Sequence, residues 1–193
     1  MADIRTFIAV LLTAELRSKI GQIQDRFRKA APEVKWVAED NFHVTMKFLG
    51  NIDEARLESI YAALERAVAD GPEPFSVNIS DAGAFPNVRR PQTIWVGLRE
   101  GTENLAALAG NIESELDKIG FPKEGRKFSS HITIGRVKYL NNINALAEAL
   151  QSAEVGEIGV FDVRSITVMK SDLRREGPVY SVQKEIPLNQ VES

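Results

Sequence analysis

The sequence predicts an α+β fold of two related lobes, with two mostly antiparallel sheets and outer helices arranged about a pseudo-twofold cleft. Three observations lead to this prediction. Short apolar, β-prone runs alternate with stretches of helical periodicity along the chain. The order strand, helix, strand, helix, strand occurs twice, and two long strand candidates close the chain as a hairpin. We expect a single domain over residues 1–193, built of approximate repeat halves 1–88 and 89–193.

The first half begins with a buried strand and an amphipathic helix. Thr13 is placed to cap this helix. The apolar stripe of the helix steps by four, three and four residues through Leu16, Ile20, Ile23 and Phe27. A second helix follows Asp53, another capping residue type. The strands of this half are expected at Arg5–Leu12, Val34–Val37, Phe42–Gly50 and Phe75–Ile79.

The second half has the same order of elements. A buried strand at Thr93–Leu98 precedes a third helix, whose apolar stripe runs from Leu105 to Ile119. A strand around His131 follows, and Asn141 is placed to open a fourth helix. The last two strands are expected at Gly159–Met169 and Val179–Ile186.

The two halves also match in detail. A shift of 88 residues places His43 on His131 and Thr45 on Thr133. Several stripe residues of the first and third helices correspond at a shift of 89 residues. This pattern indicates an internal duplication. A duplicated unit often packs about a pseudo-twofold axis, which would place the two histidine-bearing strands on opposite sides of a shared cleft.

Composition excludes several classes of protein. The chain has no cysteine, which rules out disulfides, thiolate metal sites and a cysteine nucleophile. Its net charge is −3, so nucleic acid would have to bind through a local basic cleft. The apolar run Phe7–Leu12 is too short to span a bilayer and lacks a signal-peptide cleavage pattern. We therefore expect a cytoplasmic protein that does not associate with membranes.

The two His-x-Thr strands hold every histidine in the protein. Residues i and i+2 share a face of a strand, so His43 and Thr45 point together, as do His131 and Thr133. Imidazole titrates near pH ~6.5, so one ring can be neutral while the other is protonated, and the pair can supply a general base and a general acid. Threonine hydroxyls can hold phosphoryl oxygens. This set suits phosphodiester cleavage and requires no metal.

Other chemistries fit less well. One His-x-Thr on a strand is a weak signal, because an isolated histidine is more often structural or simply exposed. A zinc or two-metal site would need added carboxylates, and neither strand contains Asp or Glu. The chain has no Gly-x-Ser-x-Gly elbow and no Gly-x-x-x-x-Gly-Lys phosphate loop. We therefore expect no metal and no cofactor.

The paired motifs resemble those of the 2H phosphoesterase superfamily, and within it those of the RNA 2′,3′-cyclic phosphodiesterases, also known as 2′-5′ RNA ligases. The resemblance covers nearly the whole chain. The matching segments are Arg5–Val10, Trp36–Val37, His43–Met46, Lys47–Gly50, Ile94–Gly97, His131–Ile134 and Gly177–Tyr180. It implies a bilobal fold and metal-independent hydrolysis of a terminal 2′,3′-cyclic phosphate on RNA to a 2′-phosphate, together with a reversible 2′-5′ ligase activity.

The resemblance also implies roles for individual residues. His43 would be the proton donor to the leaving 3′ oxygen, and His131 the base that activates water. Thr45 and Thr133 would hold the phosphate, and Arg136 matches a functional arginine of relatives. Two positions depart from the family pattern, because Ser129-Ser130 stands where a proline often precedes the second histidine, and Met46 where leucine is common. Neither departure removes a reacting group. The near-symmetry of the motifs does not reveal which histidine is the acid.

Strict alternation makes further predictions about these strands. It places Lys47 on the face of His43 and turns Phe48 into the core. It would also turn Arg136 away from the cleft, so this arginine needs a bulge or strand end at Gly135 to reach it. Without one, Arg136 would be a solvated charge at a strand end.

The expected partner is an RNA with a 2′,3′-cyclic phosphate end, such as a tRNA-like fragment. We expect the protein to be a monomer, because one chain supplies both half-sites. Candidate RNA contacts are the loop cations Arg89, Arg90, Lys123, Arg126, Lys127 and Arg174, although a single surface charge is more often simply solvated. Phe48, Phe85 and Phe128 are candidates for stacking on a base, and core packing is the better expectation for Phe48. Alternative substrates are a small cyclic nucleotide, ADP-ribose cyclic phosphate or 2′,5′-oligoadenylate. A non-catalytic RNA- or nucleotide-binding module is a further alternative.

Overall fold

The computed structural model describes residues 3–138 and 143–189. The helices are α1 (Ala14–Ala30), α2 (Leu57–Ala69), α3 (Thr102–Asp117) and α4 (Ile143–Ser152), with short 3₁₀ turns η1 (Glu39–Asn41) and η2 (Glu54–Arg56). The strands are β1 (Asp3–Leu11), β2 (Lys35–Trp36), β3 (His43–Asp53), β4 (Phe75–Phe85), β5 (Thr93–Leu98), β6 (His131–Arg136), β7 (Glu157–Val163), β8 (Ser165–Arg174) and β9 (Gly177–Pro187). No helix of the described ranges is long and apolar enough to cross a membrane.

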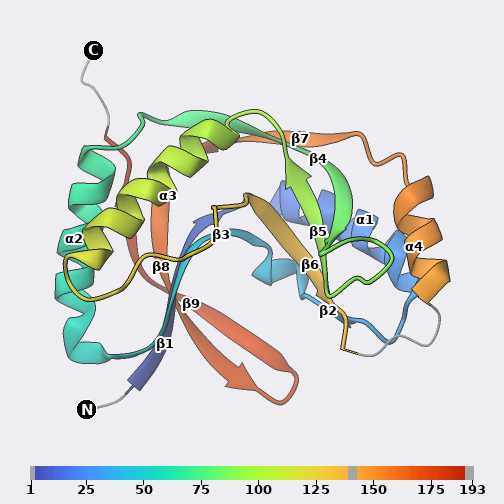
Figure 1. The fold of residues 1–193 in the computed structure, drawn as a ribbon, viewed down its shortest axis with the longest axis horizontal. Coiled ribbons are helices and arrows are strands. Elements are labelled where there is room, and N and C mark those ends of the chain that lie inside the picture. Colours follow the sequence, from blue (N-terminus) through green and yellow to red (C-terminus); the bar gives the residue numbers. More distant parts are fainter. Residues whose placement is uncertain (1–2, 139–142, 190–193) are drawn as a thin grey trace.

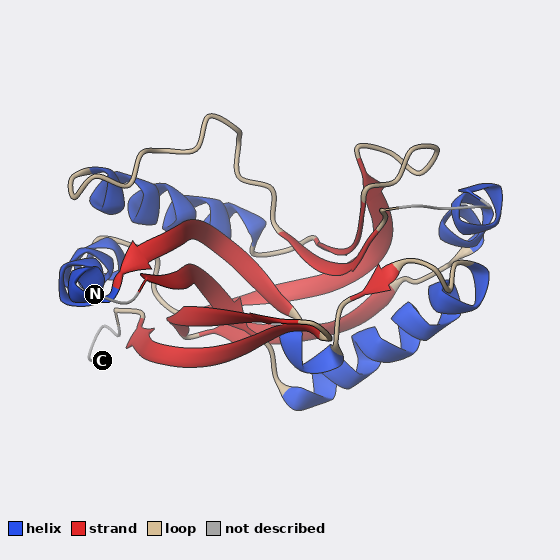
Figure 2. Cartoon of the chain, turned by 90° about the horizontal axis from the view of Figure 1, so that it is seen from below, coloured by secondary structure: helices blue, strands red, loops and turns tan. Residues whose placement is uncertain are grey.

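The strands form one curled antiparallel sheet that divides into two groups. Its order is β7-β4-β5-β6-β3-β1-β8-β9, with the short β2 beside β6. At the centre, β3 and β6 share a single backbone pair, Val44 with Ile132. We call β3-β1-β8-β9 with α2 and α3 the first lobe, and β7-β4-β5-β6 with β2, α1 and α4 the second lobe. The two helix pairs lie at opposite ends of the sheet (Figures 1 and 2). The predicted α+β class, antiparallel strands and outer helices are confirmed, while the two expected sheets are joined into one through the β3–β6 pair.

Each lobe is assembled from both halves of the chain. Strands β1 and β3 of the first half pair with each other, but β1 takes its other neighbour, β8, from the end of the chain. Strand β4, the last strand of the first half, pairs with β5 and β7 in the second lobe. The helices cross in the same way, because α1 packs on α4 and β7, while α3 packs on α2 and β3 (Figure 1).

Local sequence signals explain where several elements begin. The Thr13 side chain caps α1 by accepting a hydrogen bond from the Leu16 amide at 3.3 Å, as predicted. Asp53 accepts from the Ala55 amide at 3.0 Å and so caps the short turn η2 that leads into α2. The cap predicted at Asn141 lies outside the described residues.

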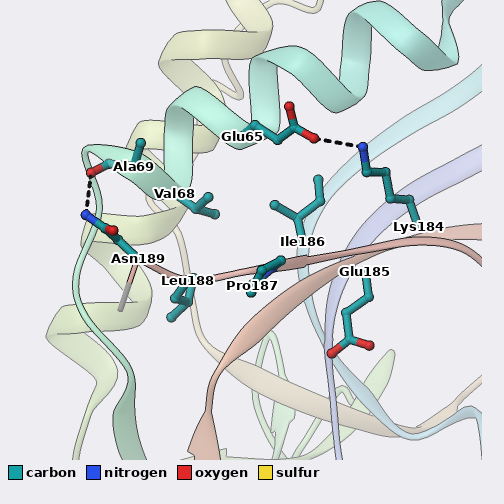
Figure 3. Close-up of a pocket in the computed structure, with 9 residues that line it drawn as sticks. All are labelled: Glu65, Val68, Ala69, Lys184, Glu185, Ile186, Pro187, Leu188 and Asn189. Atoms are coloured by element: carbon teal, nitrogen blue, oxygen red, sulfur yellow. Dashed lines mark hydrogen bonds and ion pairs between the residues drawn. The ribbon is translucent and has the colours of Figure 1, made fainter. Parts of the chain in front are cut away.

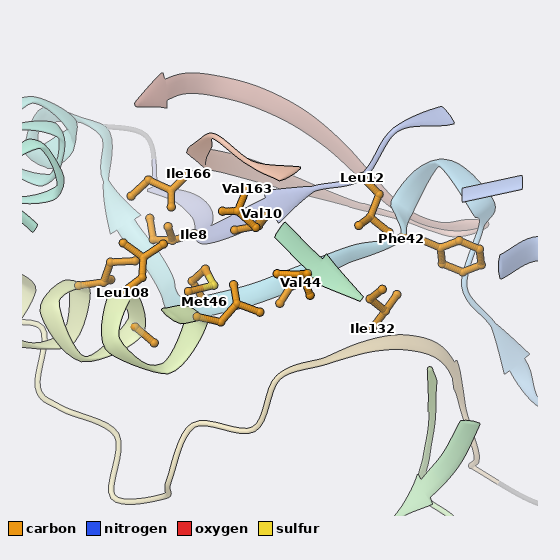
Figure 4. Packing of buried hydrophobic residues seen from close by; sticks show 14 of the residues in the cluster. Ile8, Val10, Leu12, Phe42, Val44, Met46, Leu108, Ile132, Val163 and Ile166 are labelled. Carbon is orange, nitrogen blue, oxygen red and sulfur yellow. The ribbon is translucent and has the colours of Figure 1, made fainter. Parts of the chain in front are cut away.

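The core lies on the helix-covered face of the sheet. Val44 and Ile132, the two residues of the central pair, are fully buried there. Side chains of β1, β3 and α3, including Val10, Met46 and Leu108, pack in the same cluster (Figure 4). Burial of this face holds β3 and β6 in place and leaves the side chains of their other face outside this core.

One predicted strand is wrong. The run Gly159–Met169 forms two strands, because the chain leaves the second lobe as β7 and enters the first lobe as β8. The break falls at Arg164, whose backbone carbonyl accepts a hydrogen bond from the Leu188 amide at 2.8 Å. Apolar residues continue on both sides of the break, since both strands contribute to the core, so hydrophobic pattern alone does not mark it.

Candidate active site

The two His-x-Thr motifs meet at the only backbone pair between β3 and β6. In an antiparallel ladder centred on Val44 and Ile132, His43 lies across from Thr133, and Thr45 lies across from His131. All four of these side chains are partly exposed, whereas Val44 and Ile132 point into the core. Opposite residues of such a ladder stand about 5 Å apart, so a group the size of a phosphate can touch both strands. The structure therefore brings the four predicted residues together.

The ring of His43 is held from three sides. Its Nδ1 lies 2.7 Å from the Asn41 carbonyl, which can only accept, so Nδ1 carries the proton. In the neutral ring Nε2 is then an acceptor, and the Thr45 hydroxyl donates to it at 2.9 Å. The ring also packs against Phe7, at 5.0 Å between centroids, and edge-on against Tyr180 at 5.5 Å.

His131 is held by equivalent groups. Its Nδ1 donates to the Ser129 carbonyl at 2.8 Å, at the position that corresponds to Asn41 in the first motif. Phe85 meets the ring edge-on at 5.0 Å. Among the described residues Nε2 of His131 has no hydrogen-bond partner, which distinguishes it from Nε2 of His43. The two Nε2 atoms thus differ, because that of His43 accepts from a threonine and that of His131 has no partner among the described residues.

Both histidines favour the neutral form in the free protein. Burial lowers the pKa of His43 below its ordinary 6.5, the bond to Asn41 raises it in part, and the charges of Arg136 and His131 lower it further. The pKa of His131 is also lowered, first by burial and then by Arg136, against an opposing effect of the Ser129 carbonyl. The charge of Arg136 thus disfavours the protonated form of both rings.

Matching bulges reorient the residues that follow each motif. In β3, Thr45 pairs with Ala9 and Lys47 with Ile8, so Met46 is an extra residue. The predictions for the next two positions are therefore wrong: Lys47 is buried, with 3% of its surface exposed, and Phe48 is 52% exposed.

The same bulge occurs in β6 one repeat later. Thr133 pairs with Trp95 and Gly135 with Ile94, so Ile134 is the extra residue. The predicted irregularity is present, one residue before Gly135, and it places Arg136 on the same face of the sheet as His131 and Thr133. The side chain of Arg136 is exposed and forms no ion pair within the described part of the chain.

Each bulge is supported by a polar residue of a helix in the same lobe. In the second lobe, Gln24 of α1 donates to the Val37 and Ile134 carbonyls at 2.7 and 2.8 Å. The Ile134 carbonyl also accepts from the Val37 amide at 3.0 Å. Gln24 is thus a support for the strand segment that directs Arg136.

In the first lobe the corresponding bonds involve Lys47. It donates to Glu113 of α3 at 2.7 Å and to the Pro122 carbonyl at 2.9 Å. Glu113 follows Gln24 by 89 residues, the same shift that relates the stripes of the two helices. This correspondence is the signal by which sequence analysis could have found both residues.

The other candidates are distributed around the cleft strands and their loops. Phe85 contacts His131, whereas Phe128 packs against the core. The candidate cations are exposed, at Arg89, Arg90, Lys123, Arg126, Lys127 and Arg174. Sequence reasoning missed Tyr180 as a contact of His43, because its strand lies far along the chain.

A hollow of about 570 Å³ lies elsewhere, between α2 and the end of β9 (Figure 3). Neither histidine lines it. Its polar side chains have partners, since Lys184 pairs with Glu65 at 2.7 Å and Glu185 accepts from Ser165 at 2.6 Å. The histidine pair therefore remains the candidate catalytic site.

The model of the family described as LigT like Phosphoesterase matches the chain twice, over residues 10–95 and 96–180. The chain belongs to this family. Each match contains one of the two His-x-Thr motifs. The resemblance inferred from these motifs is thereby confirmed.

Members of the LigT-like family resemble the chain along most of its length. The RNA 2′,3′-cyclic phosphodiesterase of Methanothermobacter thermautotrophicus is 36% identical over 181 residues, 92% of this chain and 95% of the relative. The protein of that name from Thermotoga maritima is 34% identical over 181 residues, 94% of both chains. The structure of Escherichia coli LigT complexed with 3′-AMP has a TM-score of 0.76 at 25% identity, covering 98% of this chain and 100% of that one.

Proposed function

We propose that the protein is a metal-independent RNA 2′,3′-cyclic phosphodiesterase that opens a terminal cyclic phosphate to a 2′-phosphate. The observation that carries the proposal is the meeting of two His-Thr pairs across the single β3–β6 contact, with each imidazole oriented by a backbone carbonyl. Relatives that bear this enzyme's name, at 30–36% identity, support the choice of substrate.

The chemistry needs one base, one acid and donors for the phosphate oxygens. Water attacks phosphorus while Nε2 of His131 accepts its proton. The bond from phosphorus to O3′ breaks, and protonated His43 gives its Nε2 proton to O3′. The products are a 2′-phosphate and a 3′-hydroxyl. With a 5′-hydroxyl of RNA in place of water, the same steps form a 2′-5′ linkage, and their reversal cleaves that linkage back to the cyclic phosphate and the 5′-hydroxyl, so we include reversible ligation in the proposal.

Three further side chains would stabilise the charge on phosphorus. Once His43 is protonated, the Thr45 hydroxyl no longer donates to its Nε2, so the hydroxyls of Thr45 and Thr133, on opposite strands, can donate to the two nonbridging oxygens. Arg136 adds a positive charge near both histidines. The free Nε2 of His131 supports its assignment as the base, because its lone pair is available to a water molecule.

The test is product analysis on an RNA oligonucleotide ending in a 2′,3′-cyclic phosphate, with a chelator present. Among residues 3–138 and 143–189, no group of three or more His, Cys, Asp or Glu is arranged to hold a metal. We expect a 2′-phosphate product and no change in rate with chelator. Loss of turnover with chelator would establish a metal requirement, and binding without turnover would indicate a non-catalytic module. Faster turnover of mononucleoside cyclic phosphates or 2′,5′-oligoadenylate would indicate a small-nucleotide enzyme.

The lowered pKa values predict where activity depends on pH. His131 must be neutral and His43 protonated, so kcat/KM, which reports the free protein, should be highest below pH 6.5 and fall as His43 loses its proton. The bound cyclic phosphate is an anion beside both rings and should raise both pKa values, moving the maximum of kcat to higher pH. Steady-state rates across acid and neutral pH check this. A maximum of kcat/KM on the alkaline side of neutrality would contradict it.

Removing the support for the second bulge should impair the site from a distance. Gln24→Leu removes the hydrogen bonds that Gln24 donates to the Val37 and Ile134 carbonyls. The free energy of unfolding should fall by about 1–3 kcal/mol. We expect kcat to fall about tenfold or more through misdirection of Arg136. Gln24→Leu should add little in an Arg136→Gln background, because the two residues act as one unit. Additive losses in the double variant would show that Gln24 serves stability alone.

We further propose that the protein acts as a monomer in the cytoplasm. One chain supplies both half-sites, so no second copy is needed to complete the cleft. Sedimentation at the concentration used for the activity assay tests the oligomeric state.

A further inference from the structure

Asn41 contacts both the first histidine and a strand near the end of the chain. Its backbone carbonyl accepts a hydrogen bond from Nδ1 of His43 at 2.7 Å, and its side-chain amide donates to the Pro178 carbonyl of β9 at 2.9 Å. Its backbone N–H donates to the Ala38 carbonyl at 2.8 Å and closes the turn η1. Because these bonds belong to one residue, the position of β9 and the orientation of the ring are coupled.

The part of the β8–β9 hairpin that contains Pro178 projects from the sheet (Figure 1). Strand β8 pairs with β1 over Thr167–Lys170, whereas its ladder with β9 continues to the pair of Arg174 and Gly177. Beyond Lys170 the hairpin is therefore a ribbon of two strands, with no third strand beside it in the described part of the chain. An isolated two-stranded hairpin is only marginally stable in water, so a bond to the rest of the lobe decides where this ribbon lies.

The ribbon carries one of the rings that pack on His43. Tyr180 follows Pro178 by two residues, is half-buried and meets the imidazole edge-on at 5.5 Å between centroids. It also meets Phe7 edge-on at 4.9 Å, and the ring of Phe7 lies 5.0 Å from the imidazole. The bond from Asn41 to the Pro178 carbonyl thus holds Tyr180 against the same ring that the Asn41 carbonyl orients.

The second histidine lacks this support within the described residues. Ser129 is the counterpart of Asn41 at the shift of 88 residues, and its carbonyl accepts from Nδ1 of His131 at 2.8 Å. Its hydroxyl is exposed and has no hydrogen-bond partner in the described ranges. The difference suits the proposed roles, because an acid must deliver its proton to one oxygen that the bound substrate fixes in place, whereas a base takes a proton from a mobile water molecule.

We propose that Asn41 is a positioning residue for the general acid and acts by holding the β8–β9 ribbon against His43, an inference that rests on the proposed function. Without the side-chain amide, the Pro178 carbonyl loses its donor and Tyr180 is no longer held on the imidazole. The ring then turns, and Nε2 of His43 delivers its proton to O3′ less often. The second half-site keeps its own contacts, so the base at His131 works as before.

Asn41→Ser removes the bond to β9 with little risk to the fold. Serine stands at the equivalent position of the second motif, where its carbonyl orients a histidine in the same way. The serine hydroxyl ends one covalent bond short of the amide nitrogen of asparagine, so it does not reach the Pro178 carbonyl. Asn41→Ala should give the same results as Asn41→Ser.

The first experiment measures single-turnover rates on two oligonucleotides that end in a 2′,3′-cyclic phosphate. One is natural, and the other has sulfur in place of O3′, which leaves as a thiolate and needs no proton from His43. Asn41→Ser should lower the rate on the natural substrate about 10- to 100-fold. It should leave the rate on the sulfur substrate nearly unchanged. Equal losses on both substrates, or no loss on the natural one, would overturn the inference.

Asn111→Ser is the matched control. Asn111 of α3 also donates its side-chain amide to backbone carbonyls of the first lobe, those of Ala67 and Asp70, at 3.3 and 3.0 Å. Within the described chain, none of its hydrogen bonds involves either motif. Both rates should stay at the wild-type level in this variant. A loss confined to the natural substrate would show that any loosening of the lobe has this effect, and it would remove the special role of Asn41.

A second measurement needs no substrate. The chain has two histidines, so nitrogen-15 NMR at neutral pH should show two Nδ1-bound ring protons, which His131→Asn assigns. In Asn41→Ser the proton on His43 should exchange with solvent about tenfold faster, and that on His131 should not change. Unchanged exchange at His43, or equal acceleration at both rings, contradicts the proposal. If the wild type hydrolyses neither oligonucleotide while His43 alone loses protection in Asn41→Ser, the positioning role stands and the proposed enzymatic activity fails instead.

Discussion

Replacing His131 with asparagine should lower kcat for hydrolysis of the cyclic phosphate by about 10²- to 10⁴-fold. The asparagine amide can still donate to the Ser129 carbonyl, as Nδ1 does at 2.8 Å, but it has no atom in place of Nε2. The substitution therefore removes the proposed base and keeps the bond that orients it. His43→Asn should have a similar effect, because its amide retains the bond to the Asn41 carbonyl. Single-turnover rates on a cyclic-phosphate oligonucleotide measure both losses.

A sulfur-substituted substrate separates the acid from the base. When sulfur replaces O3′, the leaving group is a thiolate, which departs without a proton. His43→Asn should then recover most of its rate, while His131→Asn should stay slow on this substrate. The opposite pattern would exchange the two roles, which the near-symmetric motifs do not themselves distinguish. Thermal melting of each variant checks that the fold is intact, and either variant keeping wild-type turnover would refute the mechanism.

Replacing Arg136 with glutamine should lower kcat/KM by about 10²- to 10³-fold, the loss that follows removal of a donor aimed at developing charge. The change should also alter the pH profile. Arg136 is among the causes that lower the pKa of both histidines, after burial in each case. Without its charge both pKa values should rise, so the maximum of kcat/KM should move to higher pH.

Arg136→Lys is the matched control for these two effects. Lysine keeps the charge but not the planar fork that binds two phosphate oxygens at once. We expect this variant to keep the wild-type pH maximum while losing a large part of the rate. If Arg136→Gln changed neither the rate nor the pH maximum, the side chain would be a solvated charge at the end of β6.

Much of the site could be predicted from sequence, because it depends on short-range rules. Alternation along a strand is sufficient to place His43 beside Thr45 and His131 beside Thr133. The shift of 88 residues that relates both the histidines and the threonines also shows that the two motifs are equivalent. The carbonyls of Asn41 and Ser129 that orient the rings lie at the same offset from each histidine.

The errors arise where one extra residue changes the alternation. The bulge at Met46 buries Lys47 and exposes Phe48, although the local sequence is a regular apolar strand. The buried charge is tolerated because Glu113, from a helix of the other half, pairs with it. Such a partner is found only by long-range contact, so strand periodicity does not predict it. The division of Gly159–Met169 at Arg164 has the same origin, because pairing with distant strands decides where the chain turns.

The exchange of elements between the halves has a consequence for how the molecule folds. Strand β4 finds its neighbours only in β5 and β7, and β1 needs β8 from the far end of the chain. Neither half can close its own sheet, so the two lobes form one cooperative unit rather than two independent ones. A half made alone lacks these strands, and a second copy of it could supply only the strands that correspond to them in the repeat. The resulting symmetric dimer would carry one histidine on each side of its axis, which is the arrangement that this single chain achieves covalently.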